Sequence, residues 1–188
     1  MSNITKNALA AALKKRLASH LLTDITVQSI ADEAGVSRKT FYYHFKDIYD
    51  LMEWTMREEF SRVMAGNQTL DTWPQGIANL LEYIQDNRTL VLNLLFSLDD
   101  TFFQEQLNQV VEPMMTAVFQ ELSGYLDLPE EDRKFFTMMQ VYGGVGIMLS
   151  WIKDGLVVPK EEVLERFVRY FSMAAEMLER YGKPEGNS

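Results

Sequence analysis

Two short helical patterns joined by a tight turn occupy residues 26–51, and no other part of the chain constrains the fold as much. This stretch reads TVQSIADEAGVSRKTFYYHFKDIYDL. Thr26 and Ser37 stand where helix N-caps are expected, because their side-chain oxygens can accept hydrogen bonds from the first free backbone N–H groups. Gly35 lies between the two helices, where a helix end favours a residue with positive φ. The stretch therefore predicts a helix, a tight turn and a second helix, which is the arrangement of a helix-turn-helix.

The start of the second predicted helix carries side chains that suit contact with duplex DNA. A helix that enters the major groove presents its N-terminal side chains to the base edges. Arg38 can bond guanine in a bidentate manner, Lys39 can contact guanine or phosphate, and Thr40 can offer its methyl group to thymine. Other polar residues nearby are expected to reach the flanking backbone. The predicted DNA-binding set is Thr26, Gln28, Ser37, Arg38, Lys39, Thr40, Tyr42, Tyr43, His44 and Lys46. Packing of one tyrosine against a neighbouring helix, and a packing or capping role for His44, remain alternative interpretations.

Charge is distributed unevenly along the chain, whose net charge is −9. Residues 1–46 hold seven Lys and Arg against three Asp and Glu, a balance of +4. The remaining residues hold 11 bases and 24 acids, a balance of −13. A basic segment on an acidic protein concentrates its attraction for phosphate in one place, although chance variation alone would be an alternative explanation.

Helical periodicity continues through the rest of the chain, and no alternating strand pattern stands out. The first pattern repeats Leu9, Leu13, Leu17 and Leu21 at four-residue spacing, and Pro113 is expected to kink or divide a later helix. About nine helices are predicted, at roughly residues 5–20, 26–34, 37–43, 47–66, 72–87, 89–98, 99–122, 129–153 and 159–182.

The residues TVQSIADEAGVSRKTFYYHF, with Leu51 downstream, resemble the N-terminal domain of the TetR/AcrR family of transcriptional regulators. The rest of the chain is similar to that family only in architecture. The resemblance implies an all-α fold in which residues 1–50 form a three-helix DNA-binding domain. It implies that residues 51–188 form a helical effector-binding and dimerisation domain, whose last two helices build a four-helix bundle in the dimer. A homodimer of this kind is expected to bind double-stranded DNA at a palindromic operator.

Two positions depart from the family pattern. Many members have a small residue where Lys39 stands and a lysine where this chain has Ile48. We therefore expect Lys46 or Tyr42 to supply the phosphate contact that the missing lysine would make. The residues FYYHFKDIYDL, together with WIKDGLVVP further on, are similar to a subgroup that includes an activator of dihydroxyacetone kinase operons.

Aromatic and methionine side chains are abundant in residues 51–188, and most of them must belong to an ordinary core. Methionine is flexible and fills irregular space, so some of these side chains can line a cavity between helices. The candidate effector-pocket residues are Tyr83, Phe96, Met114, Met115, Phe119, Met138, Met139 and Tyr142. Core packing is the alternative for any one of them, and a filled core would favour a protein partner over a small molecule.

Three glycines interrupt the helical pattern near residue 145, and each costs about 1 kcal/mol of helix stability relative to alanine. Close approach of a neighbouring helix across a dimer interface would explain them, and room for a ligand is the alternative. The final helical pattern has a wide apolar face suited to pairing. The predicted dimer interface comprises Gly143, Gly144, Gly146, Phe167, Tyr170, Phe171, Ala174 and Met177.

Several classes of function are not expected. The chain has no Cys and only two His, His20 and His44, and it lacks a phosphate loop, a GxSxG motif and a cluster of metal ligands. We therefore expect neither an enzyme nor a metal or cofactor site. The lack of Cys and of a signal-peptide pattern favours the cytoplasm. Apolar runs such as residues 141–152 are too short to span a bilayer, so no membrane partner is expected.

The sequence thus predicts a dimeric DNA-binding regulator. We expect a repressor whose operator binding responds to an unknown small molecule bound by residues 51–188. An activator, or a regulator controlled by a protein partner, is the alternative. The sign of regulation depends on the position of the operator, which the protein does not encode.

Overall fold

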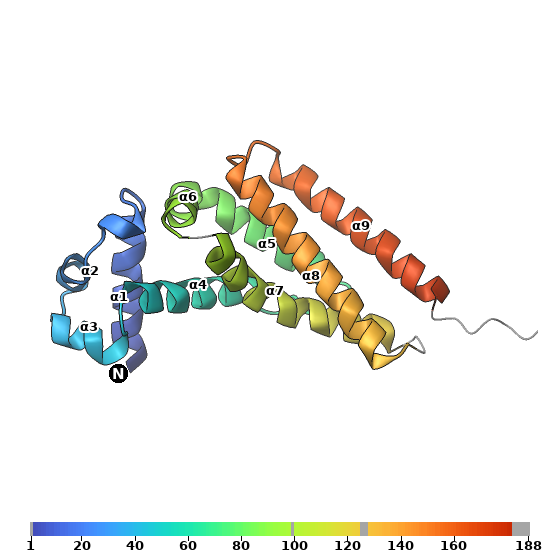
Figure 1. The fold of residues 1–188 in the computed structure, drawn as a ribbon, viewed down its shortest axis with the longest axis horizontal. Coiled ribbons are helices and arrows are strands. Elements are labelled where there is room, and N and C mark those ends of the chain that lie inside the picture. The colour runs from blue at the N-terminus through green and yellow to red at the C-terminus, as the bar shows by residue number, and fades with distance from the viewer. Residues whose placement is uncertain (1, 99, 125–127, 182–188) are drawn as a thin grey trace, which may run out of the picture. The chain divides into compact units, whose positions relative to one another are not determined.

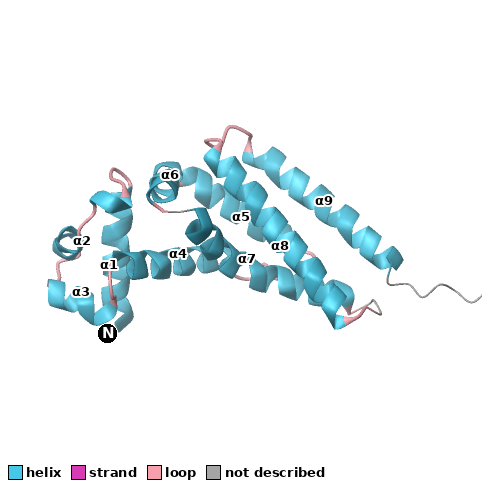
Figure 2. Cartoon of the chain, in the orientation of Figure 1, coloured by secondary structure: helices cyan, strands magenta, loops and turns pink. Residues whose placement is uncertain are grey.

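Helices form the regular structure of the described residues, 2–98, 100–124 and 128–181, in a computed structural model (Figures 1 and 2). That part of the chain contains nine α-helices, one 3-10 turn and no strand, so the prediction of an all-α fold with about nine helices is confirmed. The chain divides into two compact units. The first unit holds Met1–Phe60 and Asn87–Gln106, and the second holds Ser61–Asp86 and Leu107–Ser188.

The first unit is built around a small apolar core. Three of its helices, α1 (Ser2–Leu17), α2 (Val27–Glu33) and α3 (Arg38–His44), pack on one another. The next helix, α4 (Ile48–Met64), begins in this unit and continues into the second. The centre of the core is fully buried and consists of Leu9, Leu13, Ile30, Ala31, Phe41 and Leu51.

The first helix ends earlier than its leucine repeat predicts. Leu9, Leu13 and Leu17 are buried as expected, but α1 stops at Leu17 and Leu21 is 37% exposed. A turn follows instead, and the 3-10 segment η1 (Leu22–Asp24) places the neighbouring Leu22 in the core. The leucine spacing alone cannot show this, because Leu22 stands directly beside the position that the repeat predicts.

The helix α6 (Arg88–Ser97) belongs to the first unit although it follows α5 in the sequence. The Asn93 side-chain amide donates to the Leu17 carbonyl oxygen at 2.8 Å, and the Leu22 backbone N–H donates to Ser97 Oγ at 2.8 Å. These two hydrogen bonds satisfy backbone groups where α1 ends and η1 begins. The boundary predicted at residue 50 remains a prediction, because compactness does not test where a domain folds independently.

The second unit is a helical bundle. It combines the end of α4 with α5 (Trp73–Asp86), most of α7 (Asp100–Ser123), α8 (Glu130–Lys153) and α9 (Lys160–Tyr181). Aromatic rings join these helices: the Phe171 ring lies 4.5 Å from Trp73 and 5.3 Å from Phe119, between ring centroids. Phe119 also meets Phe136 edge to face at 5.2 Å.

Proline does not divide α7, which is continuous through Pro113. That part of the sequence prediction is wrong. Pro113 and Gln109, whose carbonyl loses its helical donor, are both exposed, so water can bond the freed carbonyl. The predicted end of the last helix at residue 182 lies outside the described residues.

The helix α8 is longer than the apolar run that the sequence suggests. By length and composition alone its 24 residues would suffice to cross a membrane, so the expectation that no segment reaches that length must be corrected. The core helix of a helical bundle can have the same length and composition, and 39% of the most apolar 18-residue stretch of α8 is buried inside the protein.

Candidate nucleic-acid interface and apolar groove

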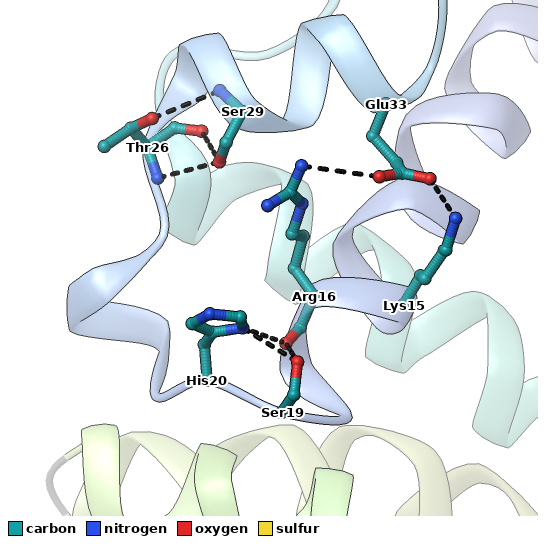
Figure 3. Close-up of polar contacts among 7 residues, drawn as sticks. All are labelled: Lys15, Arg16, Ser19, His20, Thr26, Ser29 and Glu33. Atoms are coloured by element: carbon teal, nitrogen blue, oxygen red, sulfur yellow. Dashed lines mark hydrogen bonds and ion pairs between the residues drawn. The ribbon is translucent and has the colours of Figure 1, made fainter.

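Side-chain caps fix both helices of the helix-turn-helix. Thr26 Oγ1 accepts from the Ser29 backbone N–H at 3.1 Å, and Ser29 Oγ accepts from the Thr26 N–H at 3.2 Å, which completes a capping box (Figure 3). Gly35 has φ +68°, as the predicted turn requires. Ser37 Oγ accepts from the Thr40 N–H at 3.1 Å. The predicted caps and turn are confirmed, whereas the role of Ser29 was missed although the T-x-x-S spacing signals it.

One face of α3 is buried and the other is exposed. Phe41 is fully buried and Phe45 is 3% exposed, so these rings anchor the helix in the core. Tyr43 is 83% exposed, which excludes the alternative that it packs against a neighbouring helix. Tyr42 is half exposed, meets Phe41 edge to face at 5.5 Å, and lies 6.0 Å from the Arg38 guanidinium carbon. The core therefore orients α3, and its polar face is left open.

The predicted DNA-binding residues are mostly accessible. Exposed members of the set are Thr26, Gln28, Ser37, Arg38, Lys39, Tyr42, Tyr43 and Lys46, and half-buried members are Thr40 and His44. The His44 ring lies edge to face against Tyr43 at 4.9 Å. The set thus gathers on α3, on the residues after it and at the start of α2.

An ion cluster holds α2 against α1 (Figure 3). Lys15 donates to one oxygen of Glu33, and Arg16 Nη2 lies 3.4 Å from the other. The hydrogen bond from Lys15 and the nearby positive charges hold the pKa of Glu33 below its usual value, although burial opposes this shift. Nearby, His20 Nδ1 lies within hydrogen-bonding distance of Ser19 Oγ, at 2.8 Å, and of the Arg16 carbonyl, at 3.3 Å.

The start of α4 follows the helix-turn-helix directly. Asp47 Oδ1 accepts from the Asp50 N–H at 2.9 Å and so caps the helix, and Asp50 Oδ2 accepts from the Lys46 N–H at 2.8 Å. Ile48 is half buried and supplies no charge here. A phosphate contact at this corner must therefore come from another residue.

The second unit contains an apolar groove of about 560 Å³ between α5, α7, α8 and α9. Its wall includes Trp73, Met115, Met148, Trp151 and Phe171. Polar groups are few, and the charged ones are Asp154 and Arg166, of which Arg166 is paired with Glu162. The lining is therefore suited to an uncharged, largely apolar molecule.

The sequence candidates for the pocket and for the dimer interface meet at this groove. Among the pocket candidates, Met115 and Met139 line it; Met114 and Phe119 are buried in the core, and Phe96 lies in the first unit and is 71% exposed. The remaining candidates, Tyr83, Met138 and Tyr142, do not line it. The dimer candidates that do line it are Gly143, Gly144, Phe167, Tyr170 and Phe171.

The other dimer candidates differ in exposure, since Gly146 and Met177 are exposed and Ala174 is half buried. Large apolar side chains are unusually exposed along α8 and α9: Phe135, Met138, Met139, Tyr142, Ile147, Tyr170, Met173 and Met177. A Cβ built on Gly143 or Gly146 would meet nothing within 4 Å, and one on Gly144 would meet Phe167 Cε1 at an ordinary 3.5 Å. Close packing within the chain therefore does not explain these glycines.

Comparisons with known families match both parts of the chain. The family model described as "Bacterial regulatory proteins, tetR family" matches residues 22–53. A second model, "Transcriptional regulator C-terminal region", matches residues 71–172, which is more than half of the chain.

Individual relatives agree with these models. The HTH-type dhaKLM operon transcriptional activator DhaS of Lactococcus lactis subsp. lactis (strain IL1403) is 28% identical over 101 residues, or 54% of each chain. The match thus spans about half the length of that relative. A solved structure of the dihydroxyacetone kinase operon activator DhaS superposes with a TM-score of 0.76 at 20% identity, covering 94% of this chain and 98% of that one.

A more distant solved structure shares the fold. NalD, the secondary repressor of the MexAB-OprM multidrug efflux pump in Pseudomonas aeruginosa, superposes with a TM-score of 0.57 at 13% identity, covering 93% of this chain and 98% of NalD. One of these neighbours is described as an activator and the other as a repressor, so the shared fold does not decide the sign of regulation.

Proposed function

Because the chain belongs to the TetR family of transcriptional regulators, we propose that it binds a palindromic operator as a homodimer. Operator binding represses transcription in the cytoplasm, and a small molecule held by the second unit modulates that binding. The observation that carries the proposal is the open polar face of α3, on which Arg38 and Lys39 are exposed beside a capped helix start.

The polar face of α3 supports distinct roles for its residues. Arg38 and Lys39 lie in the first turn and read base edges, and Thr40 is positioned beside them. Tyr42, Tyr43, His44 and Lys46 contact the flanking backbone, as do Thr26 and Gln28 at the start of α2. Cations are unfavourable at a helix N-terminus unless an anion is near, which supports a phosphate or an electronegative base edge as their partner.

Dimerisation through α8 and α9 is supported by the apolar side chains that these helices expose. Two helix-turn-helix motifs, one from each copy and related by a twofold axis, would read half-sites about 34–36 Å apart, or a multiple of that distance. A single short recognition helix makes few contacts, so pairing is needed for specific binding. Sedimentation velocity tests this: a chain that stays monomeric at micromolar concentration would contradict the proposed assembly.

The groove of the second unit is the proposed effector site, because it is roomy, apolar and nearly free of unpaired charge. A ligand in the groove can change operator affinity only as far as its own affinity differs between the DNA-binding state of the protein and the other state. The neutral fluorophore N-phenyl-1-naphthylamine is a suitable probe. Gly143→Leu adds a side chain to the groove lining and should reduce probe binding. Gly146→Leu makes the same change on the same helix and in the same proposed dimer contact, but outside the lining, so an effect through the dimer is matched and probe binding should fall less than in Gly143→Leu.

Equal loss of probe binding in both variants would contradict the groove as the site. Equal binding in both would do the same. Control by a protein partner instead of a small molecule is the alternative that those results would favour.

Activation in place of repression is a second candidate, favoured by the likeness to DhaS, which is described as an activator. An operator titration tests DNA binding first, using the DNA upstream of the chain's own gene and a shuffled duplex of equal composition. Equal affinity for the two duplexes would contradict operator recognition. A reporter with the operator placed over or upstream of a promoter then separates repression from activation.

A further inference from the structure

The seven Lys and Arg residues of positions 1–46 fall into two groups according to their partners. Three are held by carboxylates, in the pairs Lys14–Glu59, Lys15–Glu33 and Arg16–Glu33. Within the described part of the chain, the other four have no carboxylate partner at ion-pair distance, and they are Lys6, Arg38, Lys39 and Lys46. An unpaired cation can bind a phosphate directly, whereas a paired cation must first break its ion pair with the carboxylate.

Three of the unpaired cations surround the recognition helix. Arg38 and Lys39 lie in the first turn of α3, and Lys46 follows its last turn. The sequence places all three in the predicted DNA-binding set. Lys6 is not in that set, because it lies twenty residues before the start of the helix-turn-helix in the sequence.

Two aromatic rings hold the Lys6 side chain beside the C-terminal end of α3. Its Nζ lies 5.4 Å from the centroid of Phe45 and 5.5 Å from that of Trp54, and the two rings are 5.7 Å apart. Phe45 is the C-cap of α3 and is buried, so it fixes the ammonium group beside the end of that helix. Figure 1 shows the N-terminal end of α1 next to the end of α3.

We propose that Lys6 binds a phosphate of the DNA backbone at the C-terminal end of α3, where Ile48 leaves the start of α4 without a cation. The inference rests on the proposed binding of duplex DNA by the first unit. With seven residues, α3 is about 10 Å long, close to the major-groove width of about 12 Å. The helix α3 thus has a length similar to the groove width. Cations lie at both of its ends, Arg38 and Lys39 at the N-terminal end and Lys46 and Lys6 at the C-terminal end.

The test is the salt dependence of DNA binding by the full chain. Each phosphate contact contributes about 0.9 to the slope of log affinity against log salt, so Lys6→Gln should lower the slope by about 0.9 for each bound helix-turn-helix motif. Between 50 and 200 mM salt this reduces the loss of affinity by about 3.5-fold per motif. Fluorescence anisotropy measures the slope on two labelled duplexes of about 30 base pairs, the upstream DNA and its shuffled counterpart. Loss of a phosphate contact should weaken binding equally on both.

Two variants separate a direct contact from a change in overall charge or fold. Lys6→Arg keeps the charge over the rings and should restore the wild-type slope. Lys15→Gln removes one charge from the same helix, but that charge is already paired with Glu33, so the slope should not change. Loss of the ring contact in Lys6→Gln can lower the melting temperature, but it does not alter a salt slope.

The outcomes are distinct. A Lys6→Gln slope equal to that of the wild type, or an equal reduction in Lys15→Gln, would overturn the role of Lys6 while leaving DNA binding intact. Failure of the wild type to prefer upstream DNA over shuffled DNA would instead contradict operator recognition. A loss in Lys6→Gln that is confined to the upstream duplex would also overturn the inference, because it indicates base reading.

Discussion

Replacing Gly143 and Gly146 with alanine should stabilise the single chain and weaken its dimer. A Cβ at either position meets nothing within 4 Å, so no contact in the chain opposes the higher helix propensity of alanine. Each substitution gains about 0.8–1.0 kcal/mol in a helix interior, and two give about 2 kcal/mol. For a chain of this size the melting temperature should rise by about 4–8 °C.

The dimer should respond in the opposite direction. Both positions are exposed on α8 among the apolar side chains that we propose meet a second copy. Overpacking such a contact costs about 1–3 kcal/mol, which raises the dissociation constant about 5- to 150-fold. Sedimentation velocity measures the dissociation constant of the dimer. Thermal denaturation at a protein concentration well below that constant measures the stability of the single chain.

Two other glycines serve as controls. Gly144→Ala places its methyl in ordinary contact with Phe167 Cε1 and should also stabilise the single chain. Gly35→Ala should destabilise it, because φ at Gly35 is +68°. A lower melting temperature for the monomeric double variant would refute the reasoning that the positions are open. A stabilised chain with unchanged dimerisation would refute close helix approach as the reason for these glycines. Space for a ligand would then be the remaining explanation.

Three further predictions concern the first unit. Arg38→Ala should weaken binding to the operator by about 1–3 kcal/mol and binding to shuffled DNA much less, in anisotropy titrations; equal losses would argue against base reading. Ser37→Ala should cost about 0.5–2 kcal/mol of stability in chemical denaturation because the Thr40 N–H loses its acceptor, while Ser37→Gly should cost only a few tenths. Because the pKa of Glu33 is lowered by the hydrogen bond from Lys15, its ionised form stabilises the fold above the unfolded pKa of about 4.3, and this stabilisation is lost as pH falls through the lower folded pKa. The melting temperature of Glu33→Gln should therefore be below that of the wild type at pH near 7 and should converge with it once the pH lies below the folded pKa of Glu33. A gap that persists at such acid pH would contradict the ion cluster.

Local signals in the sequence predicted the helix-turn-helix because its geometry is set by neighbours along the chain. The caps at Thr26 and Ser37 and the turn at Gly35 each depend on residues within a few positions. The exposed and buried faces of α3 follow from the same short-range periodicity. The ion pairs of Glu33 and the ring contacts of Lys6 join separate helices, and no spacing within one helix reveals them.

The groove and the exposed face of α8 and α9 were harder to predict for the same reason. Methionine and aromatic residues suit a core, a cavity and an interface equally, so composition does not separate Met114, which is buried, from Met115, which also lines the groove. Long-range packing decides between these roles. At Pro113 local rules favour a kink or a break, but α7 continues because the freed Gln109 carbonyl is exposed to water.

The hydrogen bonds that join α6 to the end of α1 and to η1 limit how the proposed DNA-binding unit can be exchanged between regulators. A chimera that transplants only residues 1–60 would separate Leu17 and Leu22 from Asn93 and Ser97, which bond their backbone groups. A functional graft needs a second piece of about twenty residues, taken from 87–106, even though α5 intervenes in the sequence. We therefore expect the portable module of this protein to be discontinuous, so that recombination at a single crossover point would break it.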